Sequence, residues 1–425
     1  MRVWLTQTGE PLPTDGPGVR LFRTGILSAA LAERGHEGWW WTSSVAHSRK
    51  RQRCGADDAV DLGDRLRIMR LRAAGYARHV SLGRLLSHRD VARRFLRAAA
   101  SAARPDVIVC SLPTLELSLA ATAFGRRQGI PVVLDVRDLW PDIFLDRVPS
   151  WGRGLSRLAL FPFFSMARRA CAAATAIIAP TETYVDWGVR KAGRRRTPWD
   201  REFPFGYSEQ APSPEDRLRA EAFWRERGVP GAAGEFLVCF FGTMGRQFDL
   251  ETVIEAARIL QAQGRPIRFV LCGDGDHLPR YRRLAADCAN VLFPGWVSAP
   301  EIWRLMRIAS VGLAPYHSSE SFVIHLPNKP IEYMSAGLPI VSSLQGILRD
   351  LLAAYDCGVN YGNARAGELV SVLGELQARP ERLQELSRNA YALFKGRFTA
   401  ETVYGGMIDY LRSIAERRHE DPGGH

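Results

Sequence analysis

Short apolar runs alternate with longer amphipathic stretches along almost the whole chain. Each run is continuously apolar, which is typical of a strand that is covered on both faces. Strands that alternate with helices at this spacing predict right-handed βαβ units on a parallel sheet. In the first half the expected strands are residues 3–6, 39–42, 106–110, 131–135 and 176–179, and the expected helices are 19–34, 90–103, 115–128 and 155–174.

The alternation pauses once and then starts again, which predicts two Rossmann-like domains in series, 1–205 and 235–400. The pause covers residues 206–234, where three prolines surround a charged helix at 215–227, and we expect it to link the domains. Residues 401–425 form a last helix, expected to return towards the first domain, and a polar tail from residue 418. The second set of expected strands is 236–241, 267–272, 290–293, 311–314 and 340–343.

Composition predicts a globular protein of a reducing compartment. Of 425 residues, 46% are apolar and 24% are charged, and this length favours two cores. The first five residues run directly into polar Thr6, Gln7 and Thr8, and no window of about 18 apolar residues occurs, so neither an export signal nor a spanning helix is expected. The seven cysteines are scattered without a CxxC pair, which predicts buried thiols and not disulfides or a metal site.

Positive charge is concentrated in the first half of the chain. Residues 1–205 hold 33 lysines and arginines against 19 acidic residues, whereas the rest of the chain is nearly neutral. The excess favours an anionic partner, and we expect phospholipid or a phosphorylated acceptor and no nucleic acid, although a solvated basic surface would also explain it. Residues 155–169 mix aromatic side chains with arginines, which fits either an interfacial membrane segment or a buried crossover helix with a basic edge.

The segment 326–339 predicts a short helix that binds phosphate at its start. Asn328 is a good N-cap, and Gly337 is expected to end the helix. The first-turn amides lack partners within the helix, so they can hold a phosphate group, and Lys329 adds positive charge there. Glu332 lies one turn further on the same face, where its carboxylate can accept both hydroxyls of a ribose. An ordinary capped helix with a solvated glutamate is the alternative.

Three further turns follow strands of the second domain. Their glycines let a ligand approach the backbone, and Arg246 can neutralise a phosphate. Trp296 and Val297 can frame a nucleobase. Together with the short helix, the turns predict that this domain binds a nucleoside diphosphate. The expected donor contacts are Gly242, Thr243, Gly245, Gly273, Gly275, Trp296, Val297, Leu326, Pro327 and Asn328.

The order and spacing of these motifs resemble the large retaining glycosyltransferase family four. The motifs are G-T-M-G-R at 242–246, G-D-G at 273–275, G-W-V at 295–297, P-N-K-x-x-E-Y-M-S-A-G-x-P-I-V at 327–341 and C-G-V at 357–359. In the first half, residues 135–142 resemble the segment of members that build O-antigen and capsule sugars. The resemblance covers most of the chain and implies an α/β fold of the GT-B type, in which two Rossmann-like domains face each other across a cleft.

The resemblance implies a hexosyltransferase that retains the anomeric configuration. It would move a sugar from a nucleotide diphosphate, with a UDP-sugar as first candidate, to a glycan or polyprenyl-diphosphate-linked acceptor in bacterial surface polysaccharide biosynthesis. Its main task is to stabilise charge on the leaving diphosphate, and the catalytic candidates are Arg246, Lys329, Glu332 and, in the first domain, Asp138. No metal or other cofactor is expected, because the two aspartates that flank Gly275 suit a turn better than a cation site.

The chain departs from the family pattern at the expected site. Many members carry two glutamates eight residues apart; Glu332 matches the second, but Ile324 stands at the first position. The usual arginine and lysine that bind phosphate are replaced by Thr243 and Phe248. The nearby cations Arg246 and Lys329 are therefore the candidates for the phosphate contacts.

The first domain carries the candidates on the acceptor side. Gly16 and Gly18 follow the first strand, where they either face the donor phosphates or form a plain turn. An arginine and a carboxylate follow the fourth strand, where they suit either acceptor binding or a structural ion pair. We expect the protein in the cytoplasm, and the inner face of the cytoplasmic membrane, where a lipid-linked acceptor lies, is its candidate place there. The candidates for acceptor contact are Arg137, Trp140 and His79, the last without a firm role.

Three other functions compete with glycosyl transfer. A nucleotide-sugar epimerase can share the fold. A dehydrogenase would need G-x-G-x-x-G after the first strand, but Gly16 and Gly18 are followed by Arg20 and Leu21 and not by the third glycine. A dehydrogenase is therefore the weakest of these alternatives. A catalytically inactive homologue that acts as a membrane-associated binding protein would explain both the basic charge and the missing glutamate.

Overall fold

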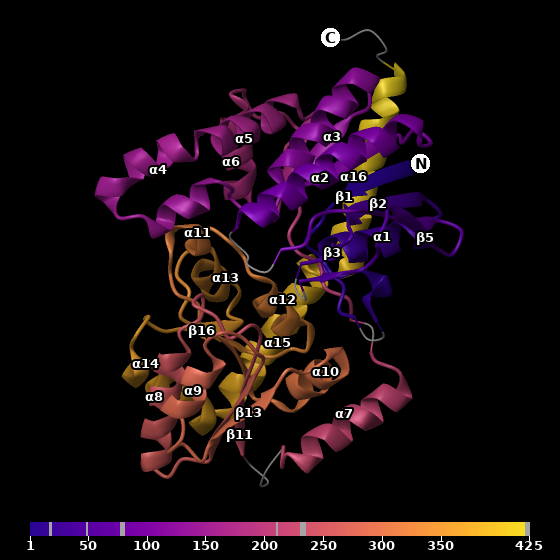
Figure 1. The fold of residues 1–425 in the computed structure, drawn as a ribbon. Helices are drawn as coiled ribbons and strands as arrows, with labels where there is room; N and C mark the ends of the chain where they lie inside the picture. Colours follow the sequence, from indigo (N-terminus) through magenta and orange to yellow (C-terminus); the bar gives the residue numbers. More distant parts are fainter. Residues whose placement is uncertain (17–18, 48–49, 77–80, 210, 230–234, 421–425) are drawn as a thin grey trace. The chain divides into compact units, whose positions relative to one another are not determined.

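The computed structural model describes residues 1–425 except 17–18, 48–49, 77–80, 210, 230–234 and 421–425 (Figure 1). The chain forms two compact units, and each contains a parallel sheet with helices, so the α/β class and the two Rossmann-like domains are confirmed. Unit 1 contains Met1–Gly206 and Ala400–His425, and unit 2 contains Tyr207–Thr399. In the described part of the chain, no helix is both long and apolar enough to cross a bilayer.

Unit 1 is built on an eight-stranded sheet with the order β10-β9-β8-β7-β1-β2-β6-β5, in which only the edge pair β5 and β6 is antiparallel. The five expected strands are confirmed, and β7 and β8 are buried along their whole length, as continuous apolar runs predict. A small antiparallel pair, β3 (Val45–Ala46) and β4 (Arg51–Gln52), lies outside this sheet. The strands are β1 (Arg2–Thr6), β2 (Glu37–Ser43), β5 (Asp58–Leu62), β6 (Leu66–Leu71), β7 (Val107–Leu112), β8 (Val132–Val136), β9 (Ala176–Ala179) and β10 (Arg201–Glu202).

Three helices of unit 1 differ from the expected bounds. The helix expected at 19–34 spans only Arg23–Glu33. The helix expected at 155–174 is split at Leu160, because Pro162 has no backbone N–H with which to continue the first segment. The helix expected from residue 90 begins at Leu82, because the Ser81 side chain caps it by accepting a hydrogen bond from the Arg84 amide. The helices are α1 (Arg23–Glu33), α2 (Leu82–Ser101), α3 (Leu115–Gln128), α4 (Arg153–Ala159), α5 (Phe161–Ala173), α6 (Glu182–Ala192) and α16 (Ala400–Glu420), with 3-10 turns η1 (Pro13–Asp15), η2 (Asp142–Arg147) and η3 (Ser150–Gly152).

Unit 2 is built on a six-stranded, fully parallel sheet with the order β13-β12-β11-β14-β15-β16. The chain moves outward from β11 to β13 and then places β14 on the other side of β11. In open parallel sheets, ligands bind at the carboxyl ends of the strands beside such a reversal. The strands are β11 (Phe236–Phe241), β12 (Ile267–Cys272), β13 (Val291–Gly295), β14 (Val311–Ala314), β15 (Ile340–Ser342) and β16 (Gly358–Asn360). The helices are α7 (Pro214–Glu226), α8 (Leu250–Ala262), α9 (Leu278–Leu284), α10 (Ala299–Ile308), α11 (Glu320–Val323), α12 (Asn328–Ser335), α13 (Ile347–Tyr355), α14 (Ala366–Ala378) and α15 (Pro380–Arg397).

The region expected to link the domains is largely part of unit 2. Its helix α7 starts after Ser213, whose side chain caps it, and packs against α10. Trp224 is buried and donates its indole N–H to the carbonyl oxygen of Glu301 at 2.9 Å. The expectation of a linker at 206–234 is therefore wrong for this helix, because Trp224 anchors an otherwise polar helix to the domain.

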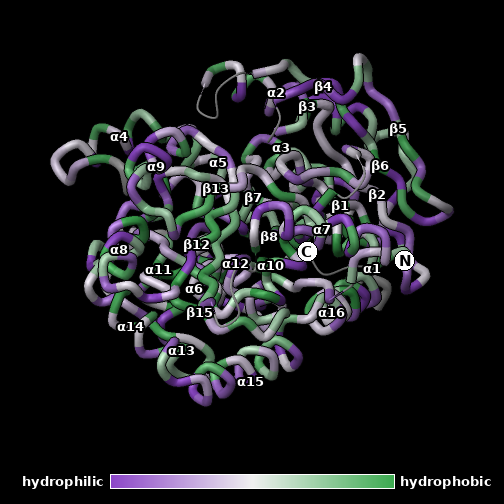
Figure 2. The backbone as a smooth tube through the Cα atoms, turned by 90° about the horizontal axis from the view of Figure 1, so that it is seen from below, coloured by the Kyte–Doolittle hydropathy of each residue, from purple (hydrophilic) through white to green (hydrophobic). Residues whose placement is uncertain are grey.

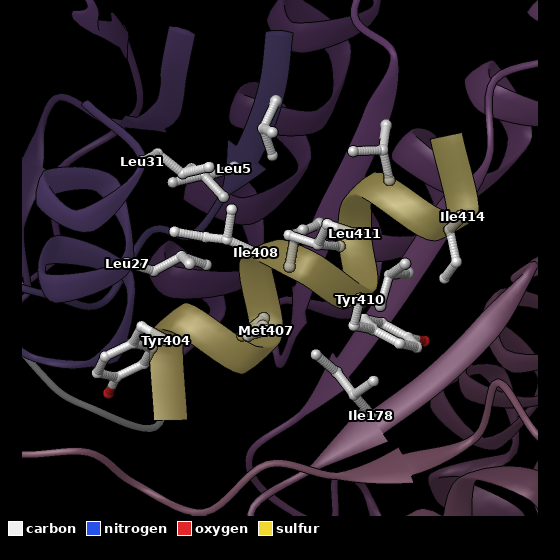
Figure 3. Packing of buried hydrophobic residues seen from close by; sticks show 14 of the residues in the cluster. Leu5, Leu27, Leu31, Ile178, Tyr404, Met407, Ile408, Tyr410, Leu411 and Ile414 are labelled. Atoms are coloured by element: carbon white, nitrogen blue, oxygen red, sulfur yellow. The ribbon is translucent and has the colours of Figure 1, made fainter. Parts of the chain in front are cut away.

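The last helix, α16, completes the core of unit 1 (Figure 3). Its apolar side chains lie in one buried cluster with those of α1 and the central strands. The Tyr410 hydroxyl also donates to the carbonyl oxygen of Trp199 at 2.7 Å. Because α16 continues to Glu420, the polar tail expected from residue 418 was placed too early. The cluster includes Leu5, Leu27, Leu31, Ile178, Tyr404, Met407, Ile408, Leu411 and Ile414.

Replacing Leu411 with alanine should lower the free energy of unfolding by about 2–5 kcal/mol, because it would leave a cavity in this fully buried cluster. Arg412 is the next residue, and its side chain is 53% exposed. Arg412→Ala should change stability by no more than about 0.5 kcal/mol. Urea unfolding, followed by tryptophan fluorescence, measures the free energy of unfolding of both variants. An equal loss of this free energy in the two variants would contradict the place of α16 in the core.

Candidate functional site

Three strand-end turns meet at the carboxyl edge of the sheet of unit 2. The amide of Gly273, after β12, donates to the carbonyl oxygen of Gly295 at the end of β13, at 2.7 Å. The amide of Met244, after β11, donates to the carbonyl oxygen of Asp274 at 2.8 Å. These bonds join the G-T-M-G-R, G-D-G and G-W-V motifs into one surface, as parallel strands with glycine turns predict.

The first two turns approach each other so closely that one of them requires glycine. Gly273 has a φ of +140°, and a Cβ atom at this position would collide with the carbonyl oxygen of Gly242. Within the first turn, the Gly245 amide donates to the carbonyl oxygen of Thr243 at 2.9 Å. Gly275 follows in the second turn. In the described residues, no three His, Cys, Asp or Glu side chains are grouped so that they could hold a metal ion.

The short helix of the predicted phosphate site is α12, and it begins one residue earlier than expected. Pro327 is its N-cap, with extended dihedral angles (φ −68°, ψ 158°), and Asn328 is the first helical residue. The predicted capping role of Asn328 is therefore wrong, because the proline itself adopts the cap conformation. No side chain caps the helix start, and a phosphate site requires first-turn amides without such a cap. Gly337 follows the helix with a φ of +64° and ends it as predicted.

Lys329 reaches from α12 to the turn after β11. Its Nζ lies 4.6 Å from the centre of the Phe248 ring, and 5.9 Å from those of Phe240 and Tyr316. A Cβ atom on Gly242 would lie 2.8 Å from the same nitrogen. Aromatic faces attract a cation, so Phe248, which stands where the family pattern has a charged residue, helps to hold the Lys329 ammonium near that place.

A cavity of about 350 Å³ opens at the reversal of the strand order. Two of its walls are the loops after β11 and β14, which are joined by the His317 amide donating to the carbonyl oxygen of Gln247 at 3.1 Å. Arg280 of α9 pairs with Glu251 of α8 at 2.9 Å. Since this glutamate is the single acidic residue of the lining, the cavity suits an anionic ligand. The lining residues are Arg246, Phe248, Glu251, His277, Arg280, Tyr281 and His317.

Sequence reasoning placed Arg246 at this site and missed three of its neighbours. His277 is the N-cap of α9, Arg280 lies in the first turn of that helix, and His317 follows β14. Their positions in the sequence could have indicated them, because they follow the predicted strands β12 and β14, and open sheets bind ligands beyond the carboxyl ends of their strands. A single histidine or arginine has no such meaning by itself, so the fold was needed to bring the three together.

The remaining donor candidates differ in exposure. Glu332 is 1% exposed on α12, so it is not the solvated glutamate of the alternative interpretation. Trp296 is 74% exposed beyond β13, where its ring is accessible to a ligand. Ile324, at the position of the first family glutamate, ends α11. The other buried candidates are Gly273, Val297, Leu326 and Pro327.

In unit 1, Arg137 belongs to a buried ion cluster. Asp135, at the end of β8, accepts hydrogen bonds at 2.8 Å from the Nε atoms of both Arg23 and Arg137. Arg137 also pairs with Glu10, which accepts hydrogen bonds from first-turn amides of α1. Burial would raise the pKa of the Asp135 carboxyl, but the two guanidinium charges hold it below its usual value. Arg137 therefore forms a structural ion pair, and its partners are Asp135 and Glu10, not the adjacent Asp138.

Trp140 and Asp138 lie beside a different polar group of unit 1. The Arg84 guanidinium lies 5.0 Å from the centre of the Trp140 ring, and its Nε donates to His88 Nε2 at 3.3 Å. His88 Nδ1 lies 3.5 Å from the carboxylate of Glu116. Burial lowers the pKa of Arg84, and nearby negative charge, including that of Asp138, opposes this shift. The group stands beyond the carboxyl ends of β7 and β8, where an acceptor site was expected.

Two of the predicted site residues, Gly18 and His79, lie outside the described residues. Gly16 has a φ of +139°, and a Cβ atom there would meet open space. Its predicted role towards donor phosphates stays a prediction.

Family models match both parts of the chain. Residues 22–200 match a model described as a glycosyl transferase 4-like domain, and residues 223–393 match one described as glycosyl transferases group 1. Together they cover most of unit 1 and most of unit 2. No curated protein matches the chain in sequence.

Several solved structures share the fold over nearly their whole length. Sucrose-phosphate synthase from Thermosynechococcus elongatus has a TM-score of 0.72 at 15% identity, and the match covers 98% of this chain and 99% of that one. For HepE of Anabaena in complex with UDP, the TM-score is 0.64 at 17% identity, with 97% and 99% covered. For WaaG, a glycosyltransferase involved in lipopolysaccharide biosynthesis, the TM-score is 0.65 at 15% identity, with 96% and 99% covered.

The two family models agree with the motifs of the turns and of α12, and the solved structures agree with the two Rossmann-like units. The chain therefore belongs to the glycosyltransferases of family four, with the GT-B fold, a glycosyl transferase 4-like first domain and a group 1 second domain.

Proposed function

We propose that this glycosyltransferase moves a hexose from a UDP-sugar to a glycan or polyprenyl-diphosphate-linked acceptor, with retention of the anomeric configuration. One observation carries the proposal. Lys329 and the start of α12 lie against the turn after β11, whose Arg246 lines a cavity at the reversal of the strand order. A lysine, uncapped helix amides and a glycine turn together offer the charge and the close backbone that a diphosphate requires.

Similar proteins support the choice of base and of pathway. HepE is described in complex with UDP and with UDP-glucose, and WaaG as involved in lipopolysaccharide biosynthesis. The segment 135–142 adds its resemblance to members that build O-antigen and capsule sugars. These observations favour a uridine donor and a role in bacterial surface polysaccharide assembly.

In the proposed reaction, the bond between the anomeric carbon and the diphosphate oxygen breaks, and a bond to the acceptor oxygen forms on the same face. The O–H bond of the acceptor hydroxyl also breaks, and its proton passes to an oxygen of the leaving diphosphate. Negative charge grows on the leaving diphosphate, so Lys329 and Arg246 bind the transition state more strongly than the ground state. Glu332 accepts the ribose hydroxyls and orients the nucleotide. The scheme needs no metal ion, because these cations supply the charge.

The acceptor is proposed to bind at the polar group of Arg84, His88, Trp140 and Asp138 in unit 1. The Trp140 ring offers an apolar face for a sugar, and the other side chains offer hydrogen bonds. A lipid-linked acceptor would bring the enzyme to the inner face of the cytoplasmic membrane.

The epimerase alternative has no support from the family models, both of which are glycosyltransferase models.

Lys329→Gln should weaken UDP binding about 10- to 100-fold, because a charged hydrogen bond is worth about 1.5–3 kcal/mol. Lys395 provides a matched control in the same unit, where it pairs with Glu209 at 2.7 Å. Lys395→Gln should leave the dissociation constant unchanged. Isothermal titration calorimetry with UDP measures both, and wild-type affinity in the Lys329 variant would remove α12 from the donor site.

Glu332→Gln should weaken UDP binding by about 1–3 kcal/mol, because a hydrogen bond to a charged carboxylate is lost. The same variant should bind 2′,3′-dideoxy-UDP as the wild type does, since this analogue lacks both hydroxyls. Calorimetry measures the affinity of the wild type and of the variant for each of the two ligands. An equal loss for both ligands would show that buried Glu332 supports the fold and does not contact the ribose.

The transfer itself is tested with UDP-, GDP- and TDP-hexoses and a polyprenyl-diphosphate-linked sugar as acceptor. NMR of the product should show the donor's anomeric configuration, and the activity should persist in EDTA. An inverted product would overturn retention. Activity lost in EDTA and restored by Mg²⁺ or Mn²⁺ would overturn the scheme without metal, and an isomerised nucleotide sugar formed without acceptor would favour the epimerase.

A further inference from the structure

Four large apolar side chains are exposed within eleven residues of unit 1, and we refer to them as the apolar ridge. Their exposed fractions are 88% for Trp151, 75% for Leu155, 72% for Leu158 and 56% for Phe161. Leu155 and Leu158 are three residues apart on α4, which places them on one side of that helix, and Trp151 on η3 and Phe161 at the start of α5 flank them in the sequence. Exposed apolar side chains that gather in this way mark an interaction surface more often than isolated ones do.

The side chains of the apolar ridge do not pack into the core of unit 1. The ridge runs from η3 through α4 to the start of α5, and α4 has no buried residue. The elements against which α4 packs are η2, η3 and α5, its neighbours along the chain. Since no residue of this helix is fully buried and its two leucines are exposed, these leucines contribute little to folding.

Charge identifies the kind of partner. Residues 148–181 contain four arginines and no acidic residue. Arg157, Arg168 and Arg169 are exposed on the same helices as the ridge. Hydrophobic and hydrophilic residues are therefore interleaved along α4 (Figure 2). A second copy of the chain bound through this surface would bring arginines against arginines, whereas an anionic bilayer offers an apolar layer beneath a negative surface.

We propose that the apolar ridge inserts into the interface of an anionic lipid bilayer, with Arg157, Arg168 and Arg169 at the level of the headgroups. Trp151 suits the boundary between headgroups and acyl chains, where tryptophan is enriched. The leucines and Phe161 bury apolar area below that boundary. This membrane contact goes beyond the sugar transfer proposed above and does not depend on it, because lipid binding needs neither donor nor acceptor.

The experiment compares wild type with the double variant Leu155→Glu, Leu158→Glu by sedimentation with vesicles of equal parts phosphatidylglycerol and phosphatidylcholine. Wild type should bind at low salt, and the double variant should bind at least about tenfold more weakly, because two apolar side chains no longer leave water. Leu218→Glu is the matched control, since Leu218 is 69% exposed on α7 of unit 2. It should bind as the wild type does.

Two further measurements identify the surface. Brominated lipid should quench the fluorescence of Trp151 in the bound protein. The Trp151→Phe variant should still bind the vesicles, but a smaller fraction of its fluorescence should be quenched.

The double variant should unfold at the same temperature as wild type, because α4 buries no side chain. Vesicle binding by both proteins to the same extent, or no binding at low salt, would overturn the proposal. So would a dimer in light scattering that the double variant abolishes, because that result would assign the ridge to a second copy.

Discussion

The carboxyl edge of the sheet of unit 2 depends on one close approach between two backbones. Gly273 comes so near the carbonyl oxygen of Gly242 that no side chain fits between them. This contact lets β11 and β12 end with their turns against each other. Gly242 has no side chain of its own, which leaves room beside it for the ammonium of Lys329. A larger residue at position 273 would force the two turns apart.

The two units use arginine and lysine at their sheet edges in different ways. In unit 1, Asp135 and Glu10 neutralise Arg23 and Arg137, and these bonds tie the end of β8 to the start of α1. In unit 2, Lys329 lies over aromatic rings, and arginines line a cavity. The first arrangement stabilises a domain, because buried charges must be paired. The second concentrates positive charge where a diphosphate is proposed to bind.

Most strands could be predicted because covered strands need continuous apolar runs, and the bounds of β11, β12 and β14 agree with the prediction residue for residue. The edge strand β5 and its neighbour β6 could not, because charged residues such as Asp58, Asp61 and Arg67 interrupt the apolar ones. The helix α7 was taken for part of a linker because it is polar except for anchors such as Trp224. The cap of α12 was misplaced because Asn328 and Pro327 both suit the start of a helix, and backbone dihedral angles decide between them.

The sequence by itself determined two parallel α/β domains and the glycine turns at one edge of the second, because hydrophobic periodicity and glycine turns are local properties of the chain. Only the tertiary structure decided which charged residues act together. It placed Arg137 against Asp135 and Glu10, and it gathered His277, Arg280 and His317 near Arg246. It also showed that the apolar ridge from Trp151 to Phe161 consists of side chains that are exposed and not buried. Charge pairing and burial depend on distances between segments that lie far apart in the sequence, and these distances exist only once the sheets have formed.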